Sequence, residues 1–233
     1  MDSGKIIQEN GKEYYRREID GQKYPVSYEL ISSQKFDYRG GSEAVNSQSV
    51  RVNNLILAAY VRQLGYYESE TGIGNGLSDY IRLNKTNGDY GFFLADAMLK
   101  NAEKHFPKLF DADIIVPIPN YKMEDKASAV SIAKYLSDFL KKPCENMLVK
   151  NKDEHIRNKT NAQKKEIFKN HDVYGFNPEF DSIIQGKNIA LIDDVVTSGY
   201  TARECLRILF DHKDQNCKIY FYCAGTTHYR YHG

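Results

Sequence analysis

The apolar and polar positions in the N-terminal part of the chain indicate a β-meander followed by helices. Short apolar segments in residues 1–40 are separated by the dipeptides Asn10-Gly11 and Asp20-Gly21. These suit tight hairpin turns, because both central residues of such turns take positive φ angles. Apolar residues recur with a helical period in residues 50–64 and again in residues 90–105, so both segments are predicted to be helices.

From residue 111 onward, short apolar runs alternate with amphipathic segments. The expected strands cover residues 113–118, 146–149, 188–192 and 218–224, and the expected helices cover residues 126–140, 160–170 and 201–210. Strands that alternate with helices are typical of βαβ units and a largely parallel sheet. The sequence therefore predicts an α/β protein with a core in residues 111–233, preceded by a meander and helical region in residues 1–110.

The strongest local signal lies between Asn188 and Thr201. An apolar strand, residues 189–192, leads into two adjacent carboxylates, Asp193 and Asp194, and then into a loop of small residues that precedes a helix. In an open parallel sheet, ligands bind beyond the carboxyl ends of the strands, where the N–H groups of a following helix attract phosphate. The segment therefore predicts a binding site for an anionic ligand.

The loop after the carboxylates has the composition of a phosphate cradle. Gly199 lets the backbone approach a ligand closely, and the hydroxyl groups of Thr197, Ser198 and Thr201 can donate hydrogen bonds. The carboxylates would repel a phosphate, so their expected task is to accept hydrogen bonds from sugar hydroxyls. The predicted ligand thus has a phosphate about one ribose away from a diol.

Residues 190–201 resemble the phosphoribosyl pyrophosphate (PRPP) motif of the type I phosphoribosyltransferases. That motif has four apolar residues, two acidic residues, two apolar residues and a Thr/Ser-Gly-x-Thr loop. The resemblance implies a type I phosphoribosyltransferase fold, a parallel sheet flanked by helices, with residues 1–110 as a hood of helices and β-meander. The PRPP contacts that it implies are Asp193, Asp194, Val195, Thr197, Ser198, Gly199, Tyr200 and Thr201.

Other segments resemble the ComF-type subgroup of this family. Residues 116–119 are similar to the strand and turn that lead into its pyrophosphate loop. Thr160 followed by Gln163 is similar to a Thr-x-x-Gln segment of the subgroup, and is equally a capping box that starts a helix. The pyrophosphate loop that the resemblance implies consists of Pro119, Asn120, Tyr121 and Lys122.

A charged stretch, residues 150–159, lies where such enzymes carry a mobile lid. Lys152 and Arg157 in this stretch are candidate catalytic cations that would neutralise the departing pyrophosphate. The alternative for each is an exposed residue of a solvated loop. The candidate catalytic set therefore consists of these two cations together with Asp193 and Asp194.

The resemblance implies an enzyme that transfers the phosphoribosyl group of PRPP to a nitrogen nucleophile, with Mg²⁺ assisting release of pyrophosphate. The acceptor is not identified by the sequence. A non-catalytic PRPP-sensing or structural module is the alternative, because a fold can keep its binding loop without the chemistry. Binding of nucleic acid linked to DNA uptake is a third interpretation, which rests on the ComF analogy alone.

The composition of the chain bears on its partners, its location and its cysteine chemistry. The chain has 32 Lys and Arg residues against 31 Asp and Glu residues, and this balance favours neither a nucleic acid nor a membrane surface as a partner. No apolar run is long enough to span a membrane and no signal region begins the chain, so we expect a cytoplasmic protein, with a homodimer as one compatible arrangement. The four cysteines have no CxxC spacing, so neither a zinc site nor a disulfide framework is predicted.

Overall fold

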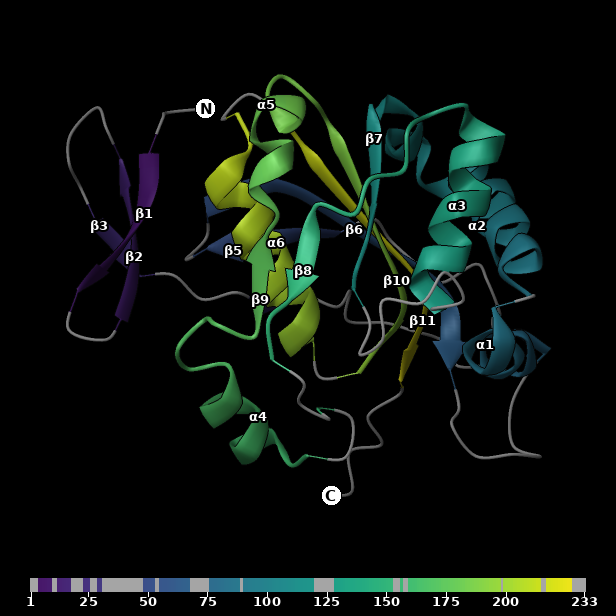
Figure 1. The fold of residues 1–233 in the computed structure, drawn as a ribbon, viewed down its shortest axis with the longest axis horizontal. Helices are drawn as coiled ribbons and strands as arrows, with labels where there is room; N and C mark the ends of the chain where they lie inside the picture. Colours follow the sequence, from purple (N-terminus) through teal and green to yellow (C-terminus); the bar gives the residue numbers. More distant parts are fainter. Residues whose placement is uncertain are drawn as a thin grey trace.

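The computed structural model describes most of the chain from residue 76 onward and the strands that precede it (Figure 1). The described residues are 4–9, 12–17, 23–25, 29–30, 48–52, 55–67, 76–88, 90–119, 128–152, 156, 159–197, 199–214 and 217–227. Among the helices in these ranges, none is both long and apolar enough to cross a membrane.

A six-stranded sheet in the order β4-β5-β6-β11-β10-β7 forms the centre of the molecule. Its strands are β4 (Glu29–Leu30), β5 (Gln48–Val52), β6 (Leu55–Tyr67), β7 (Ile114–Pro117), β10 (Ile189–Val196) and β11 (Ile219–Thr227). Strands β6, β11, β10 and β7 are parallel, whereas β4 and β5 pair antiparallel at one side. The residues of β7 are all buried, as expected for a short apolar strand of a parallel sheet.

Strand β6 corrects one expectation from the sequence. The helix predicted for residues 50–64 is wrong, because residues 55–67 form a strand that pairs with β11 on one side and β5 on the other. The run from residue 55 to residue 61 is continuously apolar, and such a run fits a buried strand as well as a helix by periodicity alone. The central sheet therefore contains strands from both sides of residue 111.

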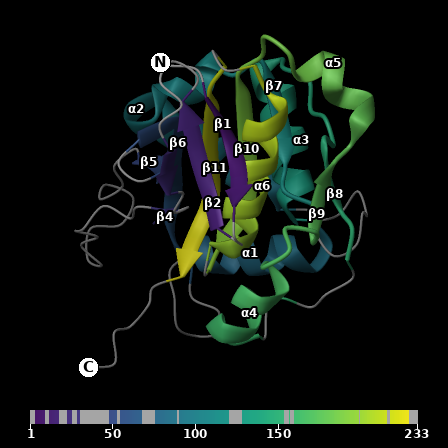
Figure 2. The same ribbon diagram turned by 90° about the vertical axis from the view of Figure 1, so that its left-hand side faces the viewer.

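Helices cover both faces of this sheet. Helices α2 (Gly91–His105) and α3 (Ser128–Leu140) lie on one face, and α6 (Tyr200–His212) lies on the other (Figures 1 and 2). Helix α1 (Gly76–Asn87) runs across the carboxyl ends of the parallel strands (Figure 2). The helices predicted for residues 90–105, 126–140 and 201–210 are confirmed, while α1 was not anticipated.

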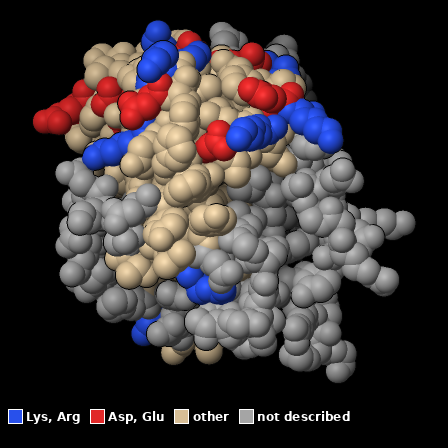
Figure 3. All heavy atoms as spheres, turned by 90° about the vertical axis from the view of Figure 1, so that its right-hand side faces the viewer, with Lys and Arg blue, Asp and Glu red and all other residues tan. Residues whose placement is uncertain are grey.

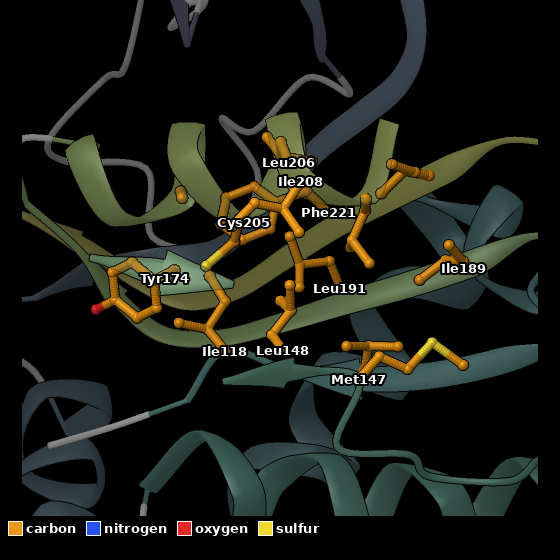
Figure 4. Close-up of a cluster of buried hydrophobic side chains, with 14 of the residues drawn as sticks. Ile118, Met147, Leu148, Tyr174, Ile189, Leu191, Cys205, Leu206, Ile208 and Phe221 are labelled. Atoms are coloured by element: carbon orange, nitrogen blue, oxygen red, sulfur yellow. The ribbon is translucent and has the colours of Figure 1, made fainter. Parts of the chain in front are cut away.

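Two hydrophobic clusters form the core, one on each face of the sheet. Leu191 and Phe221 point to the cluster under α6, where they pack with Cys205 and Leu206 (Figure 4). Alternate residues of the same strands point to the other cluster, which includes Ala190, Ile192, Tyr220 and Tyr222 under α2 and α3. This alternation follows from the pleat of a strand, and it fixes which face each helix covers.

Smaller elements complete the description. An antiparallel sheet contains β1 (Gly4–Glu9), β2 (Lys12–Arg17) and β3 (Lys23–Pro25), and a second small sheet pairs β8 (Leu148–Lys150) with β9 (Tyr174–Phe176). The remaining helical segments are η2 (Pro107–Asp111), α4 (Asn161–Ile167), η3 (Pro178–Phe180) and α5 (Asp181–Ile184). The turns that hold Asn10-Gly11 and Asp20-Gly21 lie outside the described residues.

The face formed by α1, α2 and α3 carries exposed aromatic residues. Tyr80 stacks on Phe93 with ring centroids 5.6 Å apart, and Phe92 contacts Phe139 at 5.3 Å. On this face most acidic and basic residues gather along the upper part, and an area of uncharged residues lies below them, with a few basic groups at its lower border (Figure 3). The aromatic contacts join the three helices along their outer side.

The inner side of the same three helices is joined by close polar contacts. The Asn84 side-chain amide donates hydrogen bonds to the backbone oxygen and the hydroxyl of Ser128, at 3.1 and 2.8 Å. The Ser131 hydroxyl donates to the backbone oxygen of Gly88 at 2.5 Å. A Cβ atom on Gly91 would overlap with the Ser131 Oγ and would lie 3.0 Å from the Ser131 carbonyl carbon. Glycine at the start of α2 therefore permits the close approach to α3.

Gly91→Ala is expected to destabilise the fold by about 1–3 kcal/mol, because the added methyl group overpacks the contact with Ser131. Urea denaturation of the variant and the unmodified protein measures this. Alanine favours a helix over glycine by about 1 kcal/mol, so a gain in stability would show that the contact is loose and would contradict the packing. Gly186→Ala is the comparison variant. Its φ of +71° strains a side chain while a Cβ there meets no atom within 4 Å, so its loss of stability measures backbone strain without overpacking.

Candidate functional site

The carboxyl end of β10 carries the two predicted carboxylates. Asp193 and Asp194 are each only 8% exposed. The N–H of Asp194 donates to Oδ1 of Asp193 at 2.8 Å, and the N–H of Val195 donates to Oδ1 of Asp194 at 2.6 Å. One oxygen of each carboxylate is thus held by the backbone of the next residue, which fixes both groups at the edge of the sheet.

Burial has a direct electrostatic consequence for this pair. Loss of solvent raises the pKa of Asp193 well above its usual range, and the neighbouring charge of Asp194 raises that pKa further. The N–H of Asp194 and the positive charge of Lys85 act in the opposite direction. Adjacent buried carboxylates destabilise a fold unless they are compensated, and carboxyl groups with perturbed pKa values cluster at functional sites.

Lys85 compensates part of this charge from outside the motif. Its ammonium group, on the last turn of α1, lies 3.5 Å from Oδ2 of Asp194. The Lys85 side chain is 26% exposed and the Asp194 side chain 11% exposed, so the pair is partly shielded from water. The motif does not indicate this residue, because the contact depends on how α1 crosses the sheet rather than on local sequence.

Gly199, in the loop after the carboxylates, sets the backbone path into α6. Gly199 has φ 75° and ψ 1°, a left-handed conformation that glycine adopts without strain. Helix α6 begins at the next residue, and because its N-cap is a glycine, no side chain of the N-cap residue satisfies the N–H groups of the first turn. These N–H groups and the positive end of the helix dipole lie next to the carboxylates along the chain.

An aromatic column fixes the start of α6. The Tyr200 ring stacks on Phe168 at 5.6 Å, and Phe168 stacks on Tyr174 at 6.2 Å, while the Arg203 guanidinium lies 5.0 Å from the centre of the Tyr200 ring. The Tyr174 hydroxyl also hydrogen-bonds with the side chain of Thr201. The Tyr200 side chain is thus engaged in packing, and a contact from Tyr200 to a ligand would come from its backbone.

A buried ion-pair network fixes the middle of α6 to the same neighbouring segment. Glu204 accepts hydrogen bonds from Arg207 at 2.9 Å, and its other oxygen lies 2.7 Å from Nδ1 of His171. Burial alone would raise the pKa of Glu204, but the bonds to His171 and Arg207 lower that pKa below its usual value. The aromatic column and this network together attach residues 168–174 to α6.

The predicted lid cation Lys152 forms a contact of its own. Its ammonium group lies 2.5 Å from Oδ2 of Asp172, and the N–H of Asn151 donates to the backbone oxygen of Val173 at 2.9 Å. These bonds join the two ends of the segment from residue 151 to residue 173, which contains α4. The role of Lys152 toward pyrophosphate stays a prediction, and Arg157 lies outside the described residues.

Of the other predicted site residues, some are described by the structure and some are not. Pro119 follows β7 and is buried, whereas Asn120, Tyr121, Lys122 and Ser198 lie outside the described residues. The capping box at Thr160 is confirmed: the Thr160 hydroxyl accepts from the N–H of Gln163, and the Gln163 side chain accepts from the N–H of Thr160. All four cysteines are free thiols, and burial raises the pKa of Cys144 to about 11.

Comparisons with known proteins give a similarity to solved structures. No protein-family model matches the chain, and no curated protein matches it. Similar solved structures include an allosteric regulatory enzyme of purine biosynthesis (14% identity, TM-score 0.36, covering 91% of this chain and 35% of that chain). Another is a glutamine PRPP amidotransferase from B. subtilis complexed with ADP and GMP (13% identity, TM-score 0.36, covering 91% of this chain and 36% of that chain). The chain thus spans about a third of the length of these proteins, and the functional proposal below depends on the geometry of the site itself.

Asp193→Asn is expected to stabilise the ligand-free protein, because the amide keeps the acceptor for the Asp194 N–H and removes a buried charge. The folded-state pKa of Asp193 is raised, so its ionisation destabilises the fold increasingly as the pH rises above the ordinary aspartate pKa of about 4. The gain in Tm should therefore be largest at neutral or alkaline pH and shrink toward pH 4. A gain of 1 kcal/mol corresponds to about 2–4 °C in a protein of this size.

Thermal unfolding followed by circular dichroism across this pH range measures the difference. Asp138→Asn, on the exposed side of α3, is the matched control and should change Tm by less than about 1 °C. A loss of stability in Asp193→Asn, or a gain that does not depend on pH, would contradict the assignment of a destabilising buried charge.

Proposed function

We propose that this chain binds PRPP and transfers its phosphoribosyl group to a nitrogen nucleophile. The observation that carries the proposal is the position of Asp193 and Asp194 at the carboxyl end of a parallel strand, directly before a helix whose N-cap is Gly199. This arrangement combines acceptors for sugar hydroxyls with an anion site at a helix N-terminus. A phosphorylated ribose carries both a hydroxyl edge and a phosphate, the two groups that such a site would bind.

Each part of the site has a proposed task. Asp193 and Asp194 accept hydrogen bonds from the ribose hydroxyls, which anchors the sugar at its diol edge. The backbone of the 197–201 loop and the hydroxyls of Thr197, Ser198 and Thr201 hold the 5′-phosphate at the N-terminus of α6. With both ends of the sugar fixed, C1 is presented to the acceptor in a defined orientation, which is a large share of what catalysis requires.

The proposed reaction needs no covalent bond to the protein. The bond from C1 to the pyrophosphate oxygen breaks and the bond from the acceptor nitrogen to C1 forms. The proton of that nitrogen is released to water or to the departing pyrophosphate. Positive charge develops on the ribose and negative charge on the leaving pyrophosphate. Cations from the predicted loop at Pro119–Lys122 and from the lid, including Lys152 and Arg157, are proposed to stabilise the leaving group.

Mg²⁺ is the proposed cofactor. In the described ranges, no group of three or more histidine, cysteine or acidic side chains could hold a metal ion. We propose an ion that would be held mainly by PRPP, because Mg²⁺ commonly keeps substrate phosphates as ligands. When bound in this way, Mg²⁺ supplies positive charge to the leaving group.

Two further assignments accompany this proposal. The segments at residues 116–119 and at Thr160 and Gln163 resemble the ComF-type subgroup, and on that resemblance we propose a relationship to it. The four free thiols fit a reducing compartment, which supports a cytoplasmic location.

Asp193→Asn combined with Asp194→Asn is expected to weaken PRPP binding by at least about 100-fold, because two charged hydrogen-bond acceptors for the ribose are lost. Isothermal titration of PRPP with Mg²⁺ measures the affinity, and circular dichroism verifies the fold. Asp138→Asn combined with Asp214→Asn changes the net charge equally at exposed positions and serves as the control. Affinity equal to that of the unmodified protein would refute the ribose assignment.

Catalysis is expected to appear as release of pyrophosphate that depends on an acceptor. A panel of nucleobases and amines is incubated with the protein, PRPP and Mg²⁺, and pyrophosphate is followed over time. At least one acceptor should raise the release above the hydrolysis seen with PRPP alone. Tight PRPP binding without release for any acceptor would replace the enzyme with the non-catalytic PRPP-sensing module.

A further inference from the structure

Lys85 is a charged residue of the site that the PRPP motif does not include. It lies on α1, and its ammonium group is 3.5 Å from Oδ2 of Asp194. The same charge acts on Asp193, where it opposes the effect of burial. Lys85 thus lies close to the carboxylates that are proposed to bind the sugar hydroxyls of PRPP. The question is whether it lies nearer to the 5′-phosphate or to the pyrophosphate of that ligand.

The position of Lys85 is fixed on the side of the carboxylates that leads to α3. The adjacent residue, Asn84, is fully buried and donates hydrogen bonds to the backbone oxygen and hydroxyl of Ser128, the first residue of α3. Gly199 and the start of α6 follow Asp194 along the chain and form the opposite side. The turn of α1 that carries Lys85 is therefore attached to the first residue of α3, while the Lys85 ammonium group contacts Asp194.

The shape of a phosphoribosyl ligand suggests which of its groups would lie toward α6 and which toward α3. The 5′-phosphate and the group on C1 lie at opposite ends of the sugar, and the hydroxyls on C2 and C3 lie along the edge between them. If the 5′-phosphate occupies the N-terminus of α6 and the hydroxyls contact the carboxylates, the group on C1 extends toward α3. The turn of α1 that carries Lys85 is attached to the start of α3 through Asn84, and the flexible lysine side chain gives its ammonium group a range of positions around that turn.

A second observation indicates that the last turn of α1 is not built for stability alone. Oδ1 of Asn84 is buried and has no hydrogen-bond partner among the residues that the structure describes, although its amide nitrogen is bonded to Ser128. A buried acceptor without a partner destabilises a fold. Within the described residues, the turn that carries Lys85 thus has a buried acceptor without a partner beside the start of α3, and departures of this kind are common at functional sites.

We propose that Lys85 is a binding residue for the pyrophosphate group of PRPP, and that its ammonium group leaves Asp194 for that group when PRPP binds. The inference rests on the proposed function. At 3.5 Å the pair with Asp194 is longer than an ideal charged hydrogen bond, and pyrophosphate offers more negative charge than one carboxylate. The exchange also frees Oδ2 of Asp194 to accept a hydrogen bond from the ribose.

The test compares two ligands that differ in the pyrophosphate. PRPP and ribose 5-phosphate share the 5′-phosphate and the diol, and ribose 5-phosphate has a hydroxyl on C1 in place of pyrophosphate. Lys85→Gln is expected to weaken PRPP binding by about 10- to 100-fold, the effect of one charged hydrogen bond, with Mg²⁺ present throughout. Binding of ribose 5-phosphate should stay within about threefold or become tighter, because Asp194 loses a competing partner.

Matched variants separate binding from folding. Lys85→Arg keeps the charge and should retain PRPP affinity within about fivefold. Lys100→Gln, an exposed lysine on α2 paired with Asp96, should change the affinity for neither ligand. Thermal unfolding of each variant shows whether the fold is intact, and the affinity for ribose 5-phosphate reports on the carboxylates themselves.

The outcomes distinguish this inference from the proposed function. Equal losses for both ligands in Lys85→Gln would make Lys85 a structural counter-ion and overturn the inference, and so would an unchanged PRPP affinity. In either case the proposed function would stand, because the unmodified protein binds PRPP. If the unmodified protein bound neither PRPP nor ribose 5-phosphate, the inference about Lys85 and the proposed function would both be overturned.

Discussion

Two adjacent carboxylates buried at the end of a strand are the constraint on which the rest of the site depends. Asp193 and Asp194 are each 8% exposed, and burial raises the pKa of Asp193 although Lys85 opposes it. In a low-dielectric environment such a pair destabilises the fold, so its surroundings must supply hydrogen bonds and positive charge. The backbone N–H groups of Asp194 and Val195 supply the bonds, and α1 supplies the charge. The crossing of α1 over the carboxyl edge thus brings a positive charge to the end of β10. A ligand with hydroxyl donors and negative charge would interact with the same groups.

The two sides of the site are built in different ways. On the side of α6, Gly199 takes a left-handed conformation, the aromatic column from Tyr200 to Tyr174 fixes the helix start, and Glu204 ties it to His171. On the side of α3, the contacts are made by Asn84 and Lys85, side chains that reach across from another helix. The first side suits a group that binds in the same way throughout a reaction. The second side suits a group whose charge changes, because a long lysine side chain can follow it.

The part of the site that the sequence predicts is the part whose geometry is local. The strand, the carboxylates, the glycine turn and the start of α6 lie within residues 189–201, and their arrangement depends on strand direction and on one glycine conformation. The capping box at Thr160 is local in the same sense. Lys85 could not be predicted, because its contact depends on how α1 packs on α3 through Asn84 and Ser128. Strand β6 was predicted as a helix, because an apolar run without alternation fits both elements, and its pairing partner β11 lies at the other end of the chain.

The difference between the two sides bears on how binding energy would be used in phosphoribosyl transfer. A rigid 5′-phosphate site interacts equally with the bound ligand and the transition state, so it contributes affinity and orientation but does not by itself accelerate the chemical step. The pyrophosphate gains negative charge as its bond to C1 breaks, so a cation that contacts it binds the transition state more strongly than the ground state. A lysine that begins on Asp194 and ends on pyrophosphate would also keep the carboxylates compensated before the ligand arrives. Under the proposed function, the rigid contacts of this fold would hold the group whose charge stays constant, and its flexible cation would hold the group on which charge develops.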